Sequence, residues 1–598
     1  MPTLAHNLSP KRLRVYLRRF GRNEQVVLSI LALTLGAAAG GAAILFRLGI
    51  ESVQLVALGF WGEKVVTFAA EQPWWRLLLA PAFGGLLIGI FVWNFMPGGR
   101  PQGVAHVIAA SALAGGRMSI WVGLKAAVTS FVSIGVGASV GREGPVVHLG
   151  AAIGSLFARM RHLGPRLSRT LLGCGVAAAV AASFNAPIAG VFFALEVVVG
   201  HYALSAFAPI VIASVTGTVV SRMYYGNYPA FVLPDVYEIA SVWEFPAFAL
   251  LGAICAFVAI TFMRSVFVVE ETFNRYRVPP WARPAFAGLA VGAVAAVGLP
   301  HILGVGYEAT DAALLEVYSL WLLVLLAVMK TAATAICLGA GFGGGVFSPS
   351  LFIGAMVGGA FGVVATMAFP ELSSGQGAYT IVGMGAVAGS VLGAPISTIL
   401  MIFELTGDYA ITIAVMVGTV VASVITQQLY GRSFFHVQLE RAGINIRGGQ
   451  EVGMLRSRRV ASLLDPTFET VSPETPLAEV RERLVHAPWG ELFVLRADGR
   501  LAGTITFHDM GERAVDTSRD AELTAASIMR KAPPAGVLAM DDDLERAVEV
   551  FGVTGEAHLP VVSDRSTMQL RGLAHEHALI AAYHRALTQA RREERGEA

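Results

Sequence analysis

Charged residues are scarce in this sequence. They make up 14% of the 598 residues, compared with about 25% in ordinary soluble proteins. Hydrophobic residues make up 55%, and the mean hydropathy is +0.62. This composition argues against a soluble enzyme and predicts a multi-pass membrane protein. The net charge of +2 excludes nucleic acid as a partner that is bound through a strongly positive surface.

Cysteines are also few, and they are far apart. Cys174, Cys255 and Cys337 lie in separate apolar segments, which excludes a disulfide framework and a CxxC metal site. The sequence has no HExxH, GxSxG, Walker or Rossmann motif. We therefore expect neither enzymatic activity nor a metal site.

The charged residues that are present are unevenly distributed. Residues 451–598 carry 42 of them, whereas the much longer segment 1–450 carries 44. The boundary coincides with Arg447-Gly448-Gly449-Gln450, which is typical of a linker. We predict a basic N-terminus over residues 1–24, an all-α transmembrane domain over 25–445, a linker over 446–454 and a soluble α/β part beyond it.

The N-terminal basic cluster precedes an apolar segment from Val26 to Leu48. This segment is too long for the core of a signal peptide and long enough to cross a bilayer. The positive-inside rule then places the N-terminus in the cytoplasm. We expect a protein of the cell (inner) membrane with both termini cytoplasmic and membrane lipid around its helices.

The apolar region contains an internal repeat. Pro145 and Pro349 are each followed by glycines five and nine residues later. Pro187 and Pro395 each lie twelve residues after a glycine and nine residues before a glutamate. Each of these residues is separated from its counterpart by nearly the same number of positions. This repeated spacing indicates two homologous halves.

The predicted halves cover about residues 75–200 and 285–405. Interrupted hydrophobic segments at matching places in two halves point to a transport site near the middle of the membrane. Ionisable residues in such segments are functional candidates because they are costly in lipid. The candidates are Lys125, Arg142, Glu143, Glu196, Lys330 and Glu404.

The segment Gly141-Arg142-Glu143-Gly144-Pro145 is predicted to bind an anion at a helix N-terminus. Its glycines let backbone N–H groups approach a ligand, and its proline suits the first turn of the following helix. The free N–H groups and the helix dipole favour negative charge. Gly343–Pro349 offers the same construction in the second half. Two converging N-termini would replace the hydration shell of an anion and still release it.

Glu143 would lie in the path of such an anion. Its carboxylate can occupy the position of the anion and move away when it is protonated or displaced. The alternative is a loop carboxylate paired with Arg142.

The other symmetric residues have structural interpretations. Glu196 and Glu404 are expected to bond the backbone of an interrupted helix, with proton transfer as the alternative. Lys125 and Lys330 are expected to bind helix C-terminal carbonyls or these carboxylates. His148 is expected to be a packed polar residue and not a metal ligand.

Together with Asn185-Ala186-Pro187, the two glycine-rich motifs resemble those of the CLC family of chloride channels and chloride/proton exchangers. The resemblance covers residues 26–445. It implies the CLC fold, a homodimer with one pore in each subunit, and chloride or a similar anion as the transported ion. Glu143 matches the gating glutamate of the family, with Arg142 and Gly144 beside it among the anion-binding candidates. The backbone amides of Val346 and Phe347 match those that coordinate the central anion.

Three positions depart from the CLC pattern. Gln102, next to Gly103, replaces a serine whose hydroxyl binds the anion, although the glutamine amide can still donate. Phe435 replaces a tyrosine and lacks its hydroxyl. Val197 replaces a second glutamate that brings protons from the cytoplasm to Glu143 in exchangers. Since valine carries no proton, we favour a passive, glutamate-gated chloride channel, with an exchanger that uses a non-standard inner pathway as the alternative.

The soluble part contains two similar units, over residues 455–515 and over 521–598 with a C-terminal helix. Each alternates helices with short apolar strands, and together they resemble a tandem cystathionine-β-synthase (CBS) pair. In that resemblance, Thr506 and Asp509 match a motif that binds an adenine nucleotide. An alternative is that the pair only stabilises the dimer.

Overall fold

The computed structural model describes residues 24–227, 231, 239–444, 455, 458–511, 522–532 and 536–595. Most of the basic N-terminus and all of the predicted linker, residues 446–454, fall outside these residues. The chain divides into two compact units, residues 1–445 and 446–598. We describe each unit by itself.

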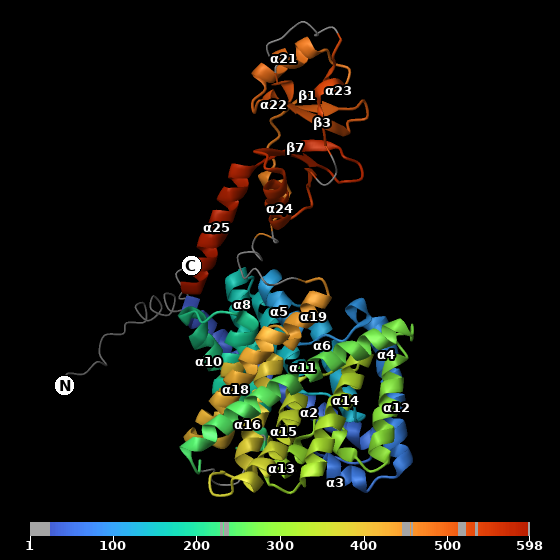
Figure 1. Ribbon diagram of the computed structural model, residues 1–598, viewed down its shortest axis with the longest axis vertical. Helices are drawn as coiled ribbons and strands as arrows, with labels where there is room; N and C mark the ends of the chain where they lie inside the picture. The colour runs from blue at the N-terminus through green and yellow to red at the C-terminus, as the bar shows by residue number, and fades with distance from the viewer. Residues whose placement is uncertain are drawn as a thin grey trace, which may run out of the picture. The chain divides into compact units, whose positions relative to one another are not determined.

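The first unit consists of helices (Figure 1). Its first half contains α2 (Glu24–Ala57), α3 (Val65–Ala70), α4 (Trp74–Phe95), α5 (Val104–Leu113), α6 (Ile120–Gly135), α7 (Glu143–Met160), α8 (Pro165–Phe184), α9 (Pro187–Phe193), the π-helix η2 (Ala194–Val199) and α10 (Leu204–Tyr225). Its second half contains α11 (Phe245–Arg275), α12 (Arg283–Ala296), α13 (Tyr307–Leu314), α14 (Leu320–Ala340), α15 (Phe347–Ala368), α16 (Gln376–Leu392), α17 (Pro395–Thr406), α18 (Tyr409–Leu429) and α19 (Phe434–Arg441). The helices α5 and α19 lie at one end of this unit, and α3 and α13 lie at the opposite end (Figure 1).

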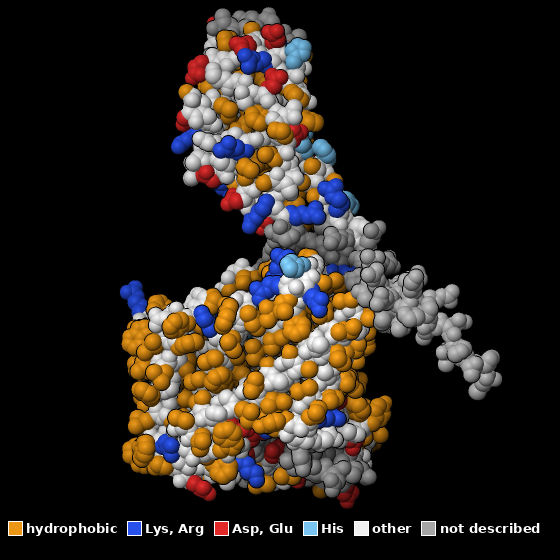
Figure 2. All heavy atoms as spheres, turned by 180° about the vertical axis from the view of Figure 1, so that it is seen from behind, with side chains coloured by type: hydrophobic (Ala, Val, Ile, Leu, Met, Phe, Trp, Pro, Cys, Tyr) orange, Lys and Arg blue, Asp and Glu red, His pale blue; other side chains and the backbone are white. Residues whose placement is uncertain are grey.

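Among the described residues, eight helices are long and apolar enough to cross a membrane. Five further apolar helices, α5, α6, α9 with η2, α12 and α17, have only 10–17 residues. Hydrophobic side chains cover most of the visible face of this unit, whereas charged side chains are scattered over the other unit (Figure 2). The prediction of a multi-pass helical membrane protein with interrupted segments is confirmed.

The glycines of the internal repeat lie where helices cross. A Cβ on Gly150 of α7 would lie 2.3 Å from the carbonyl oxygen of Gly175 on α8. A Cβ on Gly354 of α15 would lie equally close to the carbonyl oxygen of Gly383 on α16. Only glycine permits such an approach. The repeated spacing therefore records two equivalent helix crossings, α7 on α8 and α15 on α16.

The second unit combines short strands and helices. Its first part contains η5 (Val460–Leu463), β1 (Glu469–Val471), α21 (Leu477–His486), β2 (Glu491–Leu495), β3 (Leu501–Thr506), α22 (Phe507–Met510), α23 (Ala525–Ile528) and β4 (Arg530–Lys531). Its second part contains β5 (Leu538–Ala539), α24 (Leu544–Thr554), β6 (His558–Val562), β7 (Leu570–His575) and α25 (Glu576–Arg595). The sheet orders are β1-β2-β3-β4 and β5-β6-β7. In each sheet a parallel pair is followed by an antiparallel pair, which is the repeat expected from the sequence.

The segment that precedes each repeat packs against the other repeat. Val460 lies in one core with Leu538 and Leu559 of the second sheet, and Asp465 exchanges backbone hydrogen bonds with Leu573. Conversely, β4 precedes the second sheet in the chain but pairs with β3 of the first sheet. This exchange differs from the expectation that each unit is built from consecutive residues. It ties the two repeats together through backbone pairing.

Glu491 is a buried carboxylate at the start of β2, with 8% of its surface exposed. Burial, reinforced by the negative charge of Glu556, raises its pKa from 4.5 to about 7. The folded state therefore holds a proton between pH 4.5 and 7 that the unfolded state releases. The free energy of unfolding of this sheet should be highest below about pH 4.5 and fall as the pH rises to 7, by up to about 3 kcal/mol.

In Glu491→Gln this decline should be absent. Hydrogen exchange of the β2 and β3 amides in the full-length protein at pH 5 and pH 8, corrected for intrinsic rates, measures the change. Glu482→Gln, at an exposed position of α21, is the control and should behave as the wild type. Equal pH dependence in Glu491→Gln and the wild type would contradict the prediction.

Candidate functional site

The two glycine-rich motifs of the repeat meet in the middle of the first unit. Gly141 and Gly345 each donate a backbone hydrogen bond to the carbonyl oxygen of the other, both at 2.7 Å. The helices α7 and α15 begin two residues after these glycines, at Glu143 and Phe347. The bridge therefore brings two helix N-termini together, as the sequence predicts.

Several other helix N-termini in this unit are capped by carboxylates, two of them from the opposite half of the chain. The Glu404 carboxylate accepts hydrogen bonds from the backbone N–H groups of Ile188 and Ala189 at 2.8 and 2.7 Å, in the first turn of α9. Glu196 accepts from the N–H groups of Ile396 and Ser397 at 3.1 and 2.8 Å, in the first turn of α17. Each half thus caps an interrupted helix of the other half. The backbone-bonding role expected of Glu196 and Glu404 is confirmed.

Two more carboxylates cap helix N-termini, Glu308 from a distant segment and Asp408 as the residue that precedes its own helix. Glu308 accepts from the Val66 N–H at 2.5 Å at the start of α3, and Asp408 accepts from the Ala410 N–H at 2.7 Å at the start of α18. By contrast, no side chain in the described part of the chain accepts a hydrogen bond from the first-turn N–H groups of α7 or α15 in this structure. These two N-termini are left available to a ligand.

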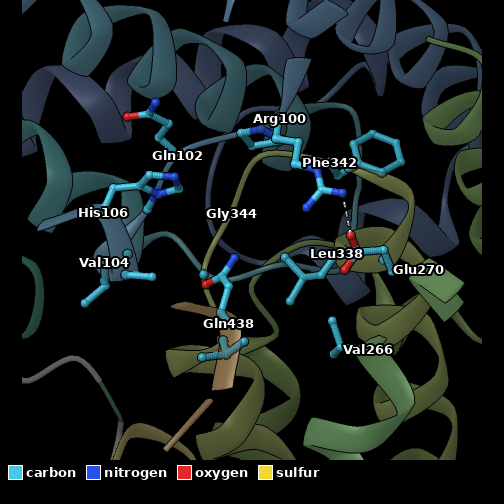
Figure 3. Close-up of a pocket in the computed structure, with 18 of the residues that line it drawn as sticks. Arg100, Gln102, Val104, His106, Val266, Glu270, Leu338, Phe342, Gly344 and Gln438 are labelled. Carbon is cyan, nitrogen blue, oxygen red and sulfur yellow. Dashed lines mark hydrogen bonds and ion pairs between the residues drawn. The ribbon is translucent and has the colours of Figure 1, made fainter. Parts of the chain in front are cut away.

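A cavity of about 690 Å³ leads to these N-termini. Both halves and α19 contribute to its wall, which includes Gln102, Gly103, Glu143, Gly144, Val346, Phe347 and Phe435. Gln102 and His106 lie on one side of it, and Arg100, Phe342 and Leu338 lie on the other (Figure 3). Exposed charged residues mark its mouth, where Arg100 pairs with Glu270 at 3.1 Å and Arg441 pairs with Glu271 at 2.6 Å.

Glu143 lies in the cavity wall, at the first position of α7, and is 1% exposed. Its Oε1 accepts a hydrogen bond from the Tyr307 hydroxyl at 2.6 Å, and its Oε2 accepts one from the Ser348 hydroxyl. Because Ser348 belongs to the second glycine-rich motif, the carboxylate lies between the two helix N-termini. This position suits the predicted gating role.

Arg142 is placed differently from its expected anion-binding role. Its guanidinium pairs with Glu63 and lies over the Tyr307 ring at 4.5 Å, and the residue does not line the cavity. The distance between Arg142 Nε and Glu143 Oε1 is 3.6 Å. Arg142 therefore supports the residues behind Glu143, and its main partner is Glu63.

Val197 lies in the π-helix η2, is 9% exposed, and does not line the cavity. His148 is fully buried, and neither ring nitrogen has a hydrogen-bond partner among the described residues. The expected contacts of the lysines with carbonyl groups are present. Lys125 donates to the carbonyl of Phe95, the last residue of α4, at 3.3 Å, and Lys330 donates to the carbonyls of residues 302 and 304.

The comparisons with known proteins agree with this architecture. The family model described as "Voltage gated chloride channel" matches residues 84–427, more than half of the chain.

This chain belongs to the voltage-gated chloride channel (CLC) family.

A putative chloride channel protein ClcB-like of Ralstonia nicotianae is 33% identical over 390 residues, which cover 64% of this chain and 90% of that protein. The H(+)/Cl(-) exchange transporter ClcA of Vibrio cholerae is 27% identical over 451 residues, which cover 73% of this chain and 95% of that protein. A model of the CBS domain matches residues 460–513.

Solved CLC structures share the fold. A slow cyanobacterial Cl⁻/H⁺ antiporter superposes with a TM-score of 0.62 at 23% identity and covers 69% of this chain and 97% of its own. A eukaryotic CLC transporter superposes with a TM-score of 0.58 at 19% identity and covers 94% of this chain and 98% of its own.

The sequence did not single out Tyr307 and Ser348, which bond the Glu143 carboxylate, or Glu63, which pairs with Arg142. Tyr307 and Glu63 lie outside the glycine-rich motifs, and Ser348 lies within one but carries no charge. The only local signal at Tyr307 is Gly304-Val305-Gly306 before it, where Gly306 has a φ of +94°. Their role depends on contacts that join residues 79 to 205 positions apart.

In the CBS unit, Thr506 and Asp509 are bonded to each other. The Asp509 Oδ2 accepts from the Thr506 N–H at 2.9 Å and from its hydroxyl at 2.8 Å. The matching position of the second repeat is His575, which bonds Asp465 at 2.9 Å and packs on the Trp489 ring at 4.4 Å. In the second repeat, the residue at this position is therefore engaged in contacts within the protein.

Replacing Glu404 by alanine should destabilise the CLC unit. The N–H groups of Ile188 and Ala189 would lose their acceptor, at a cost of about 1–3 kcal/mol for the buried Ala189 group. We expect a lower midpoint of thermal unfolding for Glu404→Ala in detergent, followed by tryptophan fluorescence, and a smaller change for Glu404→Gln, which keeps one acceptor oxygen. Glu371→Ala, at an exposed loop position, is the control. Equal midpoints for Glu404→Ala and this control would argue against the capping role.

Proposed function

We propose that this protein is a passive chloride channel in which the Glu143 carboxylate is the gate. Membership of the CLC family supports anion transport. One observation carries the gating proposal. The N-termini of α7 and α15 lie at the inner end of the cavity, and no described side chain caps either of them. Their N–H groups and dipoles favour an anion without the tight binding of a full positive charge. Glu143 lies between them, where an anion would pass.

Passive conduction is favoured over exchange because, among the described residues that line the cavity, no carboxylate other than Glu270 and Glu271 precedes Glu143. Val197 cannot carry a proton, and the neighbouring Glu196 is engaged in capping α17. Glu270 and Glu271 lie at the mouth of the cavity and are paired with arginines. The alternative is a chloride/proton antiporter with a non-standard inner pathway, since relatives are named as exchangers.

The proposed orientation places the mouth of the cavity in the cytoplasm. Arg100, Arg283 and Arg441 line this end, and positively charged residues favour the cytoplasmic side of a membrane. We further propose, from membership of the CLC family, a homodimer in the cell (inner) membrane with one pathway in each subunit. Both termini would then be cytoplasmic.

The central test uses purified protein in liposomes with an outward chloride gradient, with valinomycin setting the membrane potential. Chloride efflux and external pH are followed together. We expect rapid chloride efflux without uphill proton movement in the wild type. In Glu143→Gln we expect faster efflux that no longer depends on pH, because the neutral side chain cannot hold the position of the anion as a carboxylate does.

Glu371→Gln is the control for this experiment and should behave as the wild type. Uphill proton movement driven by chloride would overturn the channel proposal in favour of exchange. A wild-type pH dependence that survives in Glu143→Gln would overturn the role of Glu143 as the gate.

We also propose that Thr506 and Asp509 bind an adenine nucleotide, as the CBS resemblance implies. Asp509 has one carboxylate oxygen bonded to Thr506, and its other oxygen has the chemistry to accept from a ribose hydroxyl. Binding of a fluorescent ATP analogue to the full-length protein should saturate in the wild type and in Glu482→Gln, and should weaken at least tenfold in Asp509→Ala. Equal binding by the Asp509→Ala variant, or no binding by the wild type, would contradict this site.

A further inference from the structure

The Glu143 carboxylate is held by two hydroxyl groups from the second half of the chain. Tyr307, the first residue of α13, donates to Oε1 at 2.6 Å. Ser348, in the first turn of α15, donates to Oε2. Glu143, Tyr307 and Ser348 are only 1%, 6% and 2% exposed, respectively. Both carboxylate oxygens therefore have a buried donor.

The Tyr307 hydroxyl is held in place from several directions. The ring contacts that of Phe231 edge-on, with 4.9 Å between centroids, and the Arg142 guanidinium lies over it at 4.5 Å. The loop before Tyr307 is fixed by Lys330, which donates to the carbonyl of Gly304 at 2.8 Å. The packing of the ring and of the preceding loop therefore restricts where the Tyr307 hydroxyl can lie.

These donors lie outside the positions where the CLC pattern has hydroxyl groups. The serine and tyrosine of that pattern are replaced by Gln102 and Phe435, both in the cavity wall. The hydroxyl groups that bond the Glu143 carboxylate are instead those of Tyr307 and Ser348. Hydrogen bonds to a charged carboxylate are stronger than those between neutral groups, so the two hydroxyl groups hold the Glu143 carboxylate in its observed position.

Other charged groups near Glu143 lie behind Arg142. Arg142 pairs with Glu63, and Glu63 in turn pairs with Arg47 of α2 at 2.7 Å. Arg47 also lies 3.6 Å from Glu51. This series of ion pairs offsets the positive charge of Arg142. The Arg142 Nε atom is itself 3.6 Å from the Glu143 carboxylate.

Two histidines lie near the N-terminal part of α7. His106 of α5 lines the cavity, and His148 lies five residues beyond Glu143 on α7 and is close enough to His106 to interact with it electrostatically. Neither hydrogen-bonds Glu143 among the described residues. Tyr307 and Ser348 are the described side chains that do.

We propose that Tyr307 and Ser348 are positioning residues that hold the Glu143 carboxylate across the anion pathway and set the proton concentration at which the gate opens. This inference rests on the proposed role of Glu143 as the gate. Protonation of the carboxylate removes an acceptor and weakens both bonds, which frees the side chain to move. With either hydroxyl removed, the ionised form loses stabilisation, and the gate opens at a lower proton concentration.

The test measures chloride flux in liposomes with the same pH on both sides, from pH 4 to pH 8. The variants are Tyr307→Phe, which keeps the ring, Ser348→Ala, and the two combined. A hydrogen bond to a carboxylate is strong enough to shift a proton equilibrium by about one pH unit, a tenfold change. We expect the pH of half-maximal flux to rise by about one unit in each single variant and further in the combined one. Tyr318→Phe, at a half-buried tyrosine beyond α13, should leave it unchanged.

Glu143→Gln, measured beside these variants, separates the two proposals. If Glu143→Gln abolishes the pH dependence while Tyr307→Phe and Ser348→Ala keep the wild-type profile, the positioning role is overturned and the gate remains. If Glu143→Gln keeps the wild-type profile, the gate itself fails. A shift toward lower pH in the hydroxyl variants also overturns the positioning role. Should Tyr307→Phe fail to give a monodisperse protein, Ser348→Ala carries the same test.

Discussion

The structure of the membrane unit depends on one constraint: a backbone N–H group inside an apolar environment needs an acceptor. Interrupted helices expose such groups at every break. In this protein, carboxylates from distant segments supply the acceptors, as Glu404 does for α9 and Glu196 does for α17. The capping is reciprocal between the halves, so neither half satisfies its own breaks alone. This explains why costly carboxylates occupy equivalent positions in the two halves.

The N-termini of α7 and α15 differ from those of α9 and α17. The Gly141–Gly345 bridge holds them together, but no side chain in the described part of the protein caps their first turns. The carboxylate between them, Glu143, is instead bonded by hydroxyls of Tyr307 and Ser348. Capping by protein and binding of a transported anion use the same chemistry. The N-termini of α7 and α15 therefore have the chemistry that an anion site requires.

The close packing of helices makes this arrangement possible. Gly150 with Gly175, and Gly354 with Gly383, bring α7 onto α8 and α15 onto α16 at distances that leave no room for a Cβ. These contacts set the direction of the two helices whose N-termini meet at the cavity. In the CBS unit, exchange of the segments before each repeat has a comparable effect, because backbone pairing through Asp465 and Leu573 and through β3 and β4 joins the repeats.

The sequence by itself determined the membrane class, the division into two units, the repeated halves and the position of Glu143 in a glycine-rich helix start. These features are local: they depend on composition, on spacing and on motifs within a few residues. Only the tertiary structure decided that Arg142 pairs with Glu63 and does not line the cavity, and that Tyr307 reaches a carboxylate 164 positions away. A hydroxyl group has no charge and no periodicity that reveal it along the chain. Its role follows from the folding that places it beside a buried acceptor.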